Sequence, residues 1–156
     1  MSDLNTLYRQ DYTAWAKRMA ELLKAGQFSE LDIDHLLEEL AGMGASEQRE
    51  LENRFEILLA HLLKWQFQYR QLSERWREFK GDSWNNTIKE QRRRIERLLR
   101  KTPGLKADVK DVIQRAYQDA REDAADETGL PLDTFPATCP YSQAQILDKN
   151  FLPTAE

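Results

Sequence analysis

The residues from Ser46 to Phe79 read SEQRELENRFEILLAHLLKWQFQYRQLSERWREF, and this stretch decides the fold. Its apolar side chains recur at steps of three and four residues, which is the period of one face of an α-helix. They are Leu51, Phe55, Leu58, Leu62, Trp65 and Tyr69, with a weaker continuation at Leu72, Trp76 and Phe79. At a rise of about 1.5 Å per residue the stretch would extend over about 50 Å, more than any other helical segment of the chain. We therefore expect a long central helix on which the other helices pack.

The remaining helices are predicted from capping residues and from the same periodicity. We expect a helix from Asn5 or Thr6 to Gly26, a short helix from Asp32 or Asp34 to Leu40 before Gly42 and Gly44, a helix from Trp84 to Lys101 and a helix from Leu105 to Thr128. From residue 129 to 156 the chain is rich in proline but keeps regular apolar residues, which predicts a strap across the bundle with a short helix from Ser142 to about Lys149. The predicted fold class is all-α: an up-down bundle of four long helices, with a short helix after the first and a C-terminal strap, in a single domain over residues 1–156.

The composition argues against several classes of function. The 156 residues carry a net charge of -4, whereas nucleic-acid-binding proteins usually present a basic face. Cys139 is the only cysteine, so neither an intramolecular disulfide nor a thiolate metal cluster can form. No apolar run approaches the length of a membrane span, and the first residues lack the apolar run of a secretory signal. We expect a cytoplasmic protein without a cofactor, a metal or a membrane partner.

One inward position of the predicted helix from Trp84 to Lys101 is polar. Between Ile88 and Ile95 the helical period falls on Gln91 or Arg92. A polar group at or beside the core needs a hydrogen-bond partner there.

Polar residues on several predicted helices form the main candidate site. They are Glu39 (or its neighbour Glu38), His61, Arg92, Tyr117 and Arg121. A buried histidine beside a carboxylate can transfer protons, so this cluster could act in catalysis or ligand binding. The alternative is that these groups pair with one another and fix the register of the helices, which is the more usual role of buried polar groups.

Two further patterns resemble binding sites, one for a metal ion and one for nucleic acid, but the surrounding residue types argue against both. His35 has carboxylates three and four residues later, but the chain has two histidines and no Glu-x-x-His motif, so neither a di-iron centre nor a three-histidine zinc site can form. That leaves only a mixed histidine–carboxylate site, and we expect His35 to be exposed instead. The basic run Arg92–Arg94 could face nucleic acid, but interleaved and facing carboxylates favour a solvated, salt-bridged surface.

Several stretches stand out together by their order and spacing. They are Leu37–Leu40 with Gly44, Ser46–Leu51, His61–Gln66, Ser83-Trp84 with Ile88–Arg92, Ala116–Arg121, Glu127–Leu130, Phe135-Pro136 and Cys139–Tyr141. This pattern covers about Tyr8 to Pro153 and resembles the bacterial family called domain of unknown function family 29. The resemblance implies an all-α bundle and no assigned activity. The chain departs from the family between Tyr69 and Asp82, where it has additional helical sequence.

The sequence favours a non-catalytic interaction protein that binds a protein partner or a second copy of itself. Trp76 and Phe79 lie beyond the length of the central helix that the other helices can cover, so if exposed they would form an apolar contact surface. The alternative function is an enzyme or small-ligand binder that uses the polar cluster in a solvent-connected pocket. The chain contains neither a glycine-rich phosphate loop nor a serine-centred elbow motif.

Overall fold

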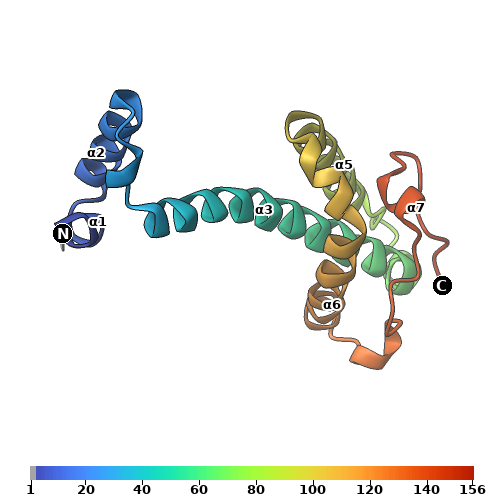
Figure 1. The fold of residues 1–156 in the computed structure, drawn as a ribbon. Coiled ribbons are helices and arrows are strands. Elements are labelled where there is room, and N and C mark those ends of the chain that lie inside the picture. The colour runs from blue at the N-terminus through green and yellow to red at the C-terminus, as the bar shows by residue number, and fades with distance from the viewer. Residues whose placement is uncertain (1–2) are drawn as a thin grey trace. The chain divides into compact units, whose positions relative to one another are not determined.

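The structure is a computed structural model that describes residues 3–156, and every regular element in that range is helical (Figure 1). The elements are α1 (Asp3–Gln10), α2 (Tyr12–Ala25), the 3-10 turn η1 (Phe28–Glu30), α3 (Ile33–Phe67), α4 (Tyr69–Arg75), α5 (Asp82–Lys101), η2 (Pro103–Asp108), α6 (Val109–Thr128), η3 (Leu132–Thr134) and α7 (Gln143–Leu147). The predicted all-α fold class is confirmed. Within residues 3–156, no helix combines the length and apolar character that crossing a bilayer requires.

Contacts divide the chain into two compact units, Met1–Ser46 and Glu47–Glu156. We call them the N-terminal unit and the C-terminal unit. Helix α3 contributes its first residues to one unit and the rest to the other. A compact set of contacts is not by itself an independently folding domain. The single domain over residues 1–156 therefore stays a prediction.

In the N-terminal unit, α1 and α2 pack around a small core made by Trp15, Met19 and Leu22. The predicted single first helix is divided in two at Asp11. The carboxylate of Asp11 accepts a hydrogen bond from the backbone N–H of Ala14 at 3.1 Å, which is the geometry of an N-cap, so α2 starts anew at this point. The predicted end of the helix is confirmed, because Gly26 has a φ of 74° and its N–H bonds to carbonyls of the last turn.

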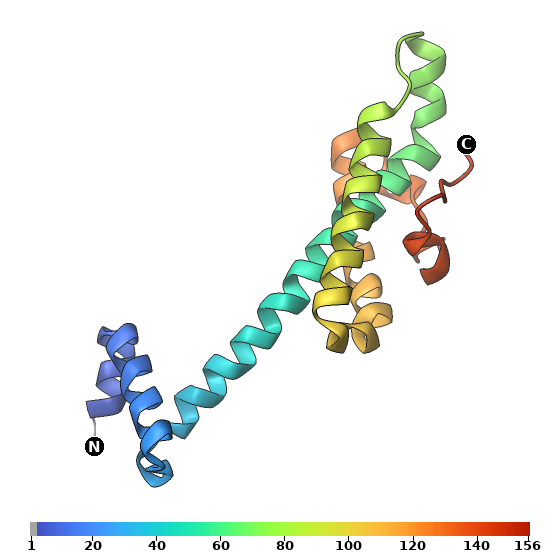
Figure 2. The same ribbon diagram turned by 90° about the horizontal axis from the view of Figure 1, so that it is seen from above.

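The core of the C-terminal unit lies between the second part of α3, α5 and α6, and Figure 2 shows α5 crossing the second part of α3 at an angle. Four residues of the predicted apolar stripe, Leu51, Phe55, Leu58 and Leu62, are fully buried there. Their inward positions follow directly from the three-and-four spacing that predicted the helix. The other two members of the stripe, Trp65 and Tyr69, are half-buried and stack on each other with ring centroids 4.4 Å apart.

The beginning of the central helix was predicted wrongly. Helix α3 starts at Ile33, so the predicted short helix ending at Leu40 is the first part of α3 rather than a separate element. Gly42 and Gly44 do not end it, since neither adopts a positive φ. Glycine in a helix interior costs about 1 kcal/mol relative to alanine, an amount that a long helix can absorb.

The predicted end of the central helix, at Phe79, also lies too far along the chain. Helix α3 ends at Phe67, and Gln68, with φ at -128° and ψ at -23°, separates it from α4. The apolar residues that continue the helical period beyond this point belong to α4 and to the turn that follows. The chain returns into α5 through Gly81, whose φ of 68° only glycine adopts readily.

The C-terminal strap, residues 129–156, packs its apolar residues into the same core. Phe135, Tyr141 and Ile146 are buried and join the cluster formed by the long helices. Its short helix, α7, is capped by Ser142 as predicted, with a reciprocal pair of hydrogen bonds to Gln145.

Candidate functional site

Arg92 lies inside the C-terminal unit and holds the strap. Its Nε donates to the carbonyl oxygen of Ile146 at 2.8 Å, its Nη1 to that of Phe151 at 2.7 Å and its Nη2 to that of Gln145 at 3.3 Å. The residue is 6 % exposed. Burial lowers the pKa of the guanidinium, which the nearby Asp148 partly offsets. The fork of donors therefore fastens α7 and the chain after it to α5.

Tyr117 and Arg121 hold an earlier part of the strap from α6. The Tyr117 hydroxyl donates to the carbonyl oxygen of Pro136, and Arg121 Nε donates to that of Phe135 at 3.0 Å. Burial raises the pKa of Tyr117 to about 12, while the charge of Arg121 one turn along the helix acts in the opposite direction. Both side chains thus bind neutral backbone groups in an irregular segment.

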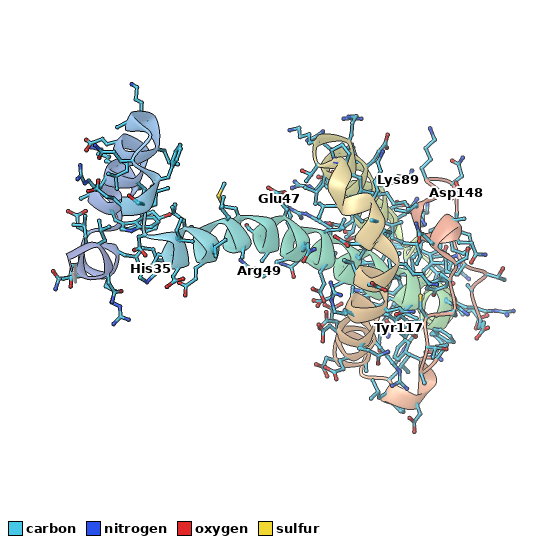
Figure 3. The ribbon with its side chains drawn as sticks, viewed as in Figure 1. His35, Glu47, Arg49, Lys89, Tyr117 and Asp148 are labelled. Carbon is cyan, nitrogen blue, oxygen red and sulfur yellow. The ribbon has the colours of Figure 1, made fainter. Side chains whose placement is uncertain are left out.

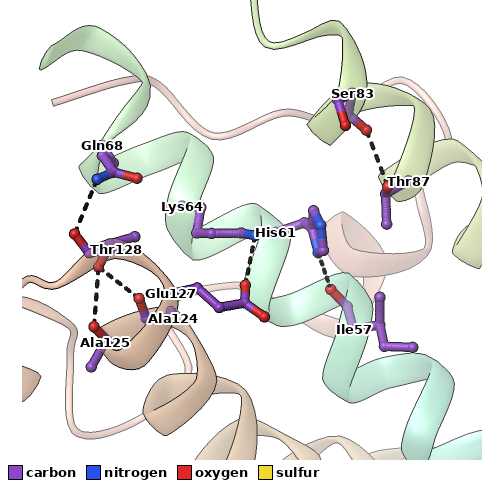
Figure 4. Close-up of polar contacts among 10 residues, drawn as sticks. All are labelled: Ile57, His61, Lys64, Gln68, Ser83, Thr87, Ala124, Ala125, Glu127 and Thr128. Carbon is purple, nitrogen blue, oxygen red and sulfur yellow. Dashed lines mark hydrogen bonds and ion pairs between the residues drawn. The ribbon is translucent and has the colours of Figure 1, made fainter. Parts of the chain in front are cut away.

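His61 is half-buried on α3, close to a partly buried ion pair (Figure 4). Its Nδ1 lies 2.8 Å from the carbonyl oxygen of Ile57, and since a carbonyl only accepts, Nδ1 carries the proton. Burial lowers the pKa of His61, which favours the neutral form of the ring. One turn away, Lys64 Nζ donates to the carboxylate of Glu127 at 2.7 Å and lies 5.4 Å from the centre of the Trp84 ring. This pair was not predicted, because Lys64 lies next to an apolar stripe without belonging to it.

Glu39 belongs to the N-terminal unit, where it accepts hydrogen bonds from two tyrosines. The hydroxyl groups of Tyr8 and Tyr12 donate to its two oxygens, the second at 2.7 Å. These bonds lower the pKa of Glu39 and raise that of Tyr8 to about 12. The carboxylate is therefore held in its charged form by neutral donors.

His35 was predicted to be exposed, and this is wrong. Its ring stacks on Tyr8 with centroids 3.9 Å apart, and its Nδ1 lies 2.7 Å from Oδ2 of Asp32 (His35 is labelled in Figure 3). Oδ2 of Asp32 also accepts from the indole N–H of Trp15 at 3.1 Å. Burial raises the pKa of Asp32, but the bonds from His35 and Trp15 outweigh it and leave the pKa below its usual value. These contacts order the start of α3 against α1 and α2.

Of the five residues of the predicted polar cluster, the structure brings together Tyr117 and Arg121. No hydrogen bond or ion pair between described residues joins any two of the five. Each has a polar partner elsewhere: the strap carbonyls for Arg92, Tyr117 and Arg121, a carbonyl of its own helix for His61, and tyrosine hydroxyls for Glu39. Each of the five side chains thus contributes to ordering the fold.

Carboxylates also gather between α3 and α6. Glu56 is half-buried near Asp119 and Asp123, and burial together with these two neighbours raises its pKa to about 7. Among the residues that the structure describes, no group of three or more histidine, cysteine or acidic side chains is placed to hold a metal ion.

The predicted contact surface at Trp76 and Phe79 is exposed in part. Trp76 is 53 % exposed, with the Arg75 guanidinium 5.3 Å from its ring centre. Phe79 is half-buried and packs against the rings of Tyr69 and Trp84. A contact surface at Trp76 stays a prediction.

Exposed apolar side chains are concentrated in the N-terminal unit. Of nine large apolar side chains that are exposed in the described chain, seven lie between residues 12 and 43: Tyr12, Leu23, Phe28, Ile33, Leu37, Leu40 and Met43. The last four lie on α3 and form what we call the α3 apolar surface. The sequence analysis did not predict this surface, because a separate short helix would have packed these residues into the core of the bundle.

The comparisons with known proteins add a family and no activity. No curated protein and no solved structure matches this chain significantly. A family model does match, over residues 7–152, which is nearly the whole chain. The order of motifs from Leu37 to Tyr141 that suggested this family is thereby explained. The chain belongs to the family described as domain of unknown function DUF29.

Proposed function

We propose that this chain is a non-catalytic interaction module that self-associates through the α3 apolar surface. Support comes from the exposure of Ile33, Leu37, Leu40 and Met43, which are 51 to 68 % exposed on one helix. Steps of four, three and three residues place them on one side of α3. A contiguous apolar stripe of this kind on a helix is typical of a helix–helix contact.

The small core of the N-terminal unit supports the same proposal. Among the residues of this unit whose burial the structure describes, only Trp15, Met19 and Leu22 are buried. Units of this size bury too little apolar surface to be stable without a further contribution, such as a disulfide, a metal or a partner. The only cysteine, Cys139, lies in the other unit, so a partner is the contribution that fits this chain best.

A second copy of the chain fits this surface better than a different protein. An isologous pair needs only one self-complementary stripe. If two α3 helices cross antiparallel between Ala41 and Gly42, Leu40 of one copy faces Met43 of the other. Glycine at 44, on the same side of α3 as the stripe, would let the two backbones approach closely, and within the described chain nothing lies within 4 Å of a Cβ built there.

The affinity of such a pair can be estimated from the exposed area. Full burial of a large apolar side chain is worth about 1.5 to 3 kcal/mol, and these side chains are already half to a third buried, so each would add about 1 kcal/mol. Eight of them across two copies give about 8 kcal/mol, before the cost of association, with the neighbouring exposed side chains adding to it. With an association cost of at least about 4 kcal/mol, about 4 kcal/mol remains before the neighbouring side chains contribute, so we expect a dissociation constant between about 0.1 and 1 mM.

Sedimentation equilibrium on the full chain tests this proposal. We expect a monomer–dimer equilibrium in the wild type and a monomer for the double variant Leu37→Glu/Leu40→Glu, because two charges would be desolvated in the contact. Leu132→Glu is the matched control, since it changes another exposed leucine, on η3, and should leave the equilibrium unchanged. A wild type that stays monomeric up to about 1 mM, or a double variant that associates like the wild type, would overturn the proposal.

Trp76→Glu separates the two candidate surfaces. If it abolishes association while Leu37→Glu/Leu40→Glu does not, the contact lies at Trp76 rather than on α3. The alternative function, an enzyme or ligand binder using the five-residue polar cluster, has less support, because each of these residues bonds to a different group of the chain and the five do not meet at one site.

A further inference from the structure

A cleft of about 750 Å³ opens in the C-terminal unit between α5, η2 and the end of α7. Figure 3 labels Lys89, which lines the cleft from α5, and Asp148, which lies between the lining residues Leu147 and Lys149. The cleft is lined by six basic side chains: Lys89, Arg92, Arg93, Arg100, Lys106 and Lys149. One acidic residue, Glu96, and two apolar ones, Leu99 and Leu147, also line it. The cleft thus combines an apolar patch with strongly positive surroundings.

Most of this positive charge is not neutralised within the described chain. Arg93 pairs with Glu90, and Arg100 pairs with Glu96 at 3.9 Å. The ion pairs between described residues include none with Lys89, Lys106 or Lys149. These three lysines come from three different elements, α5, η2 and the strap, so their convergence on one cleft is a product of the fold and not of a basic run.

Arg92 supplies a buried charge to the same cleft. Its three hydrogen bonds go to backbone carbonyl oxygens, which are neutral, and no carboxylate is bonded to it. A guanidinium has five N–H donors, so two remain beyond these three bonds. A buried charge without a bonded counter-ion is costly, the nearby Asp148 offsets that cost only in part, and an anion entering the cleft would compensate the rest.

We propose that this cleft binds a small organic phosphate, with the phosphate near Arg92, Lys89 and Lys149 and the rest of the molecule on Leu99 and Leu147. Several converging cations favour phosphate over a singly charged carboxylate, and guanidinium forks suit phosphate oxygens. The volume lies in the range of small-molecule sites, about 300 to 1,000 Å³. Because Arg92 is 6 % exposed, only a group small enough to enter the cleft can reach it, which argues against a nucleic-acid strand or a protein helix as the ligand.

Isothermal titration calorimetry of the full chain at low salt tests this site, with three probes: ADP, hexyl phosphate and inorganic pyrophosphate. We expect ADP or hexyl phosphate to bind saturably, at least about tenfold more tightly than pyrophosphate, because pyrophosphate has no part that covers the two leucines. If neither organic phosphate binds below about 1 mM, or if pyrophosphate binds as tightly as both, the proposal is wrong.

Matched charge reversals locate the binding. Lys89→Glu/Lys149→Glu should weaken the better organic phosphate by at least about tenfold, since two charge-assisted contacts are lost. Lys80→Glu/Lys110→Glu makes the same change in net charge at exposed lysines outside the cleft and should weaken binding less than about twofold. Thermal unfolding checks that both variants are folded. Equal weakening by the two pairs, or displacement of the ligand by a single-stranded oligonucleotide that binds more tightly, would overturn the assignment.

Discussion

Replacing Arg92 by methionine removes the main polar attachment of the strap while keeping a side chain of similar length. Three hydrogen bonds are lost, two of them short, at 2.7 and 2.8 Å. Hydrogen bonds from a charged donor are worth about 1.5 to 3 kcal/mol each, so the two short bonds account for about 3 to 6 kcal/mol. Removing a buried charge returns part of this as desolvation free energy. We therefore expect the free energy of unfolding to fall by about 3 kcal/mol.

Urea unfolding measures this loss, and tryptic cleavage after Lys149 reports on the strap itself. Arg92→Met should shift the urea midpoint downward and speed that cleavage, because Ile146 and Phe151 lose the donors that hold their carbonyls. Arg93→Met is the matched control, since Arg93 is exposed and its ion pair among the described residues is with Glu90, and it should change stability by less than about 0.5 kcal/mol. The reasoning is refuted if the two variants are equally stable.

Three further substitutions test other parts of the structure. Because the pKa of Glu56 is raised to about 7, the folded state holds a proton that the unfolded state releases, and stability falls as the pH rises from about 4.5 to 7. Glu56→Gln should therefore raise the free energy of unfolding at pH 8 by on the order of 1 kcal/mol, after allowing for solvent screening. The gain should vanish near pH 4, and urea titrations at a series of pH values measure both. Gly81→Ala should destabilise the C-terminal unit by about 2 kcal/mol in thermal unfolding, because φ is 68° and the new Cβ would lie 2.7 Å from the Trp65 and Tyr69 rings. Gly44→Ala should instead stabilise α3 by about 1 kcal/mol in dilute solution, because alanine favours a helix interior over glycine. The same substitution should weaken self-association in sedimentation. Stronger association would contradict the close crossing of two α3 helices.

The parts of the fold that depend on side-chain periodicity were predictable. The stripe from Leu51 to Leu62 is buried as its spacing requires, Gly26 ends its helix and Ser142 caps α7. The polar inward position between Ile88 and Ile95 is also confirmed, since Gln91 and Arg92 are both buried.

The partners of the polar residues could not be predicted in the same way. Arg92, Tyr117 and Arg121 bind carbonyl groups of an irregular strap, and every residue carries a carbonyl, so no residue type marks these acceptors. The boundaries of α3 were missed for a related reason. Local signals such as Gly42 and Gly44 compete with helix continuation, and the outcome depends on small free-energy differences summed over the whole helix.

The cleft in the C-terminal unit could not be predicted from the sequence either. The basic run of α5 was expected to be a solvated face, and Arg93 and Arg94 do pair with Glu90. Lys106 and Lys149, however, are distant in sequence and join Lys89 only through the course of η2 and the strap.

Hydrogen exchange of the backbone amides in Ile33–Met43, measured at about 1 μM and about 500 μM protein, tests the central claim most directly. If a second copy covers the α3 apolar surface, these amides become more protected at the higher concentration, while amides of α5 and α6 exchange equally at both. Equal exchange of Ile33–Met43 at the two concentrations would show that no second copy binds this surface, and would contradict the account.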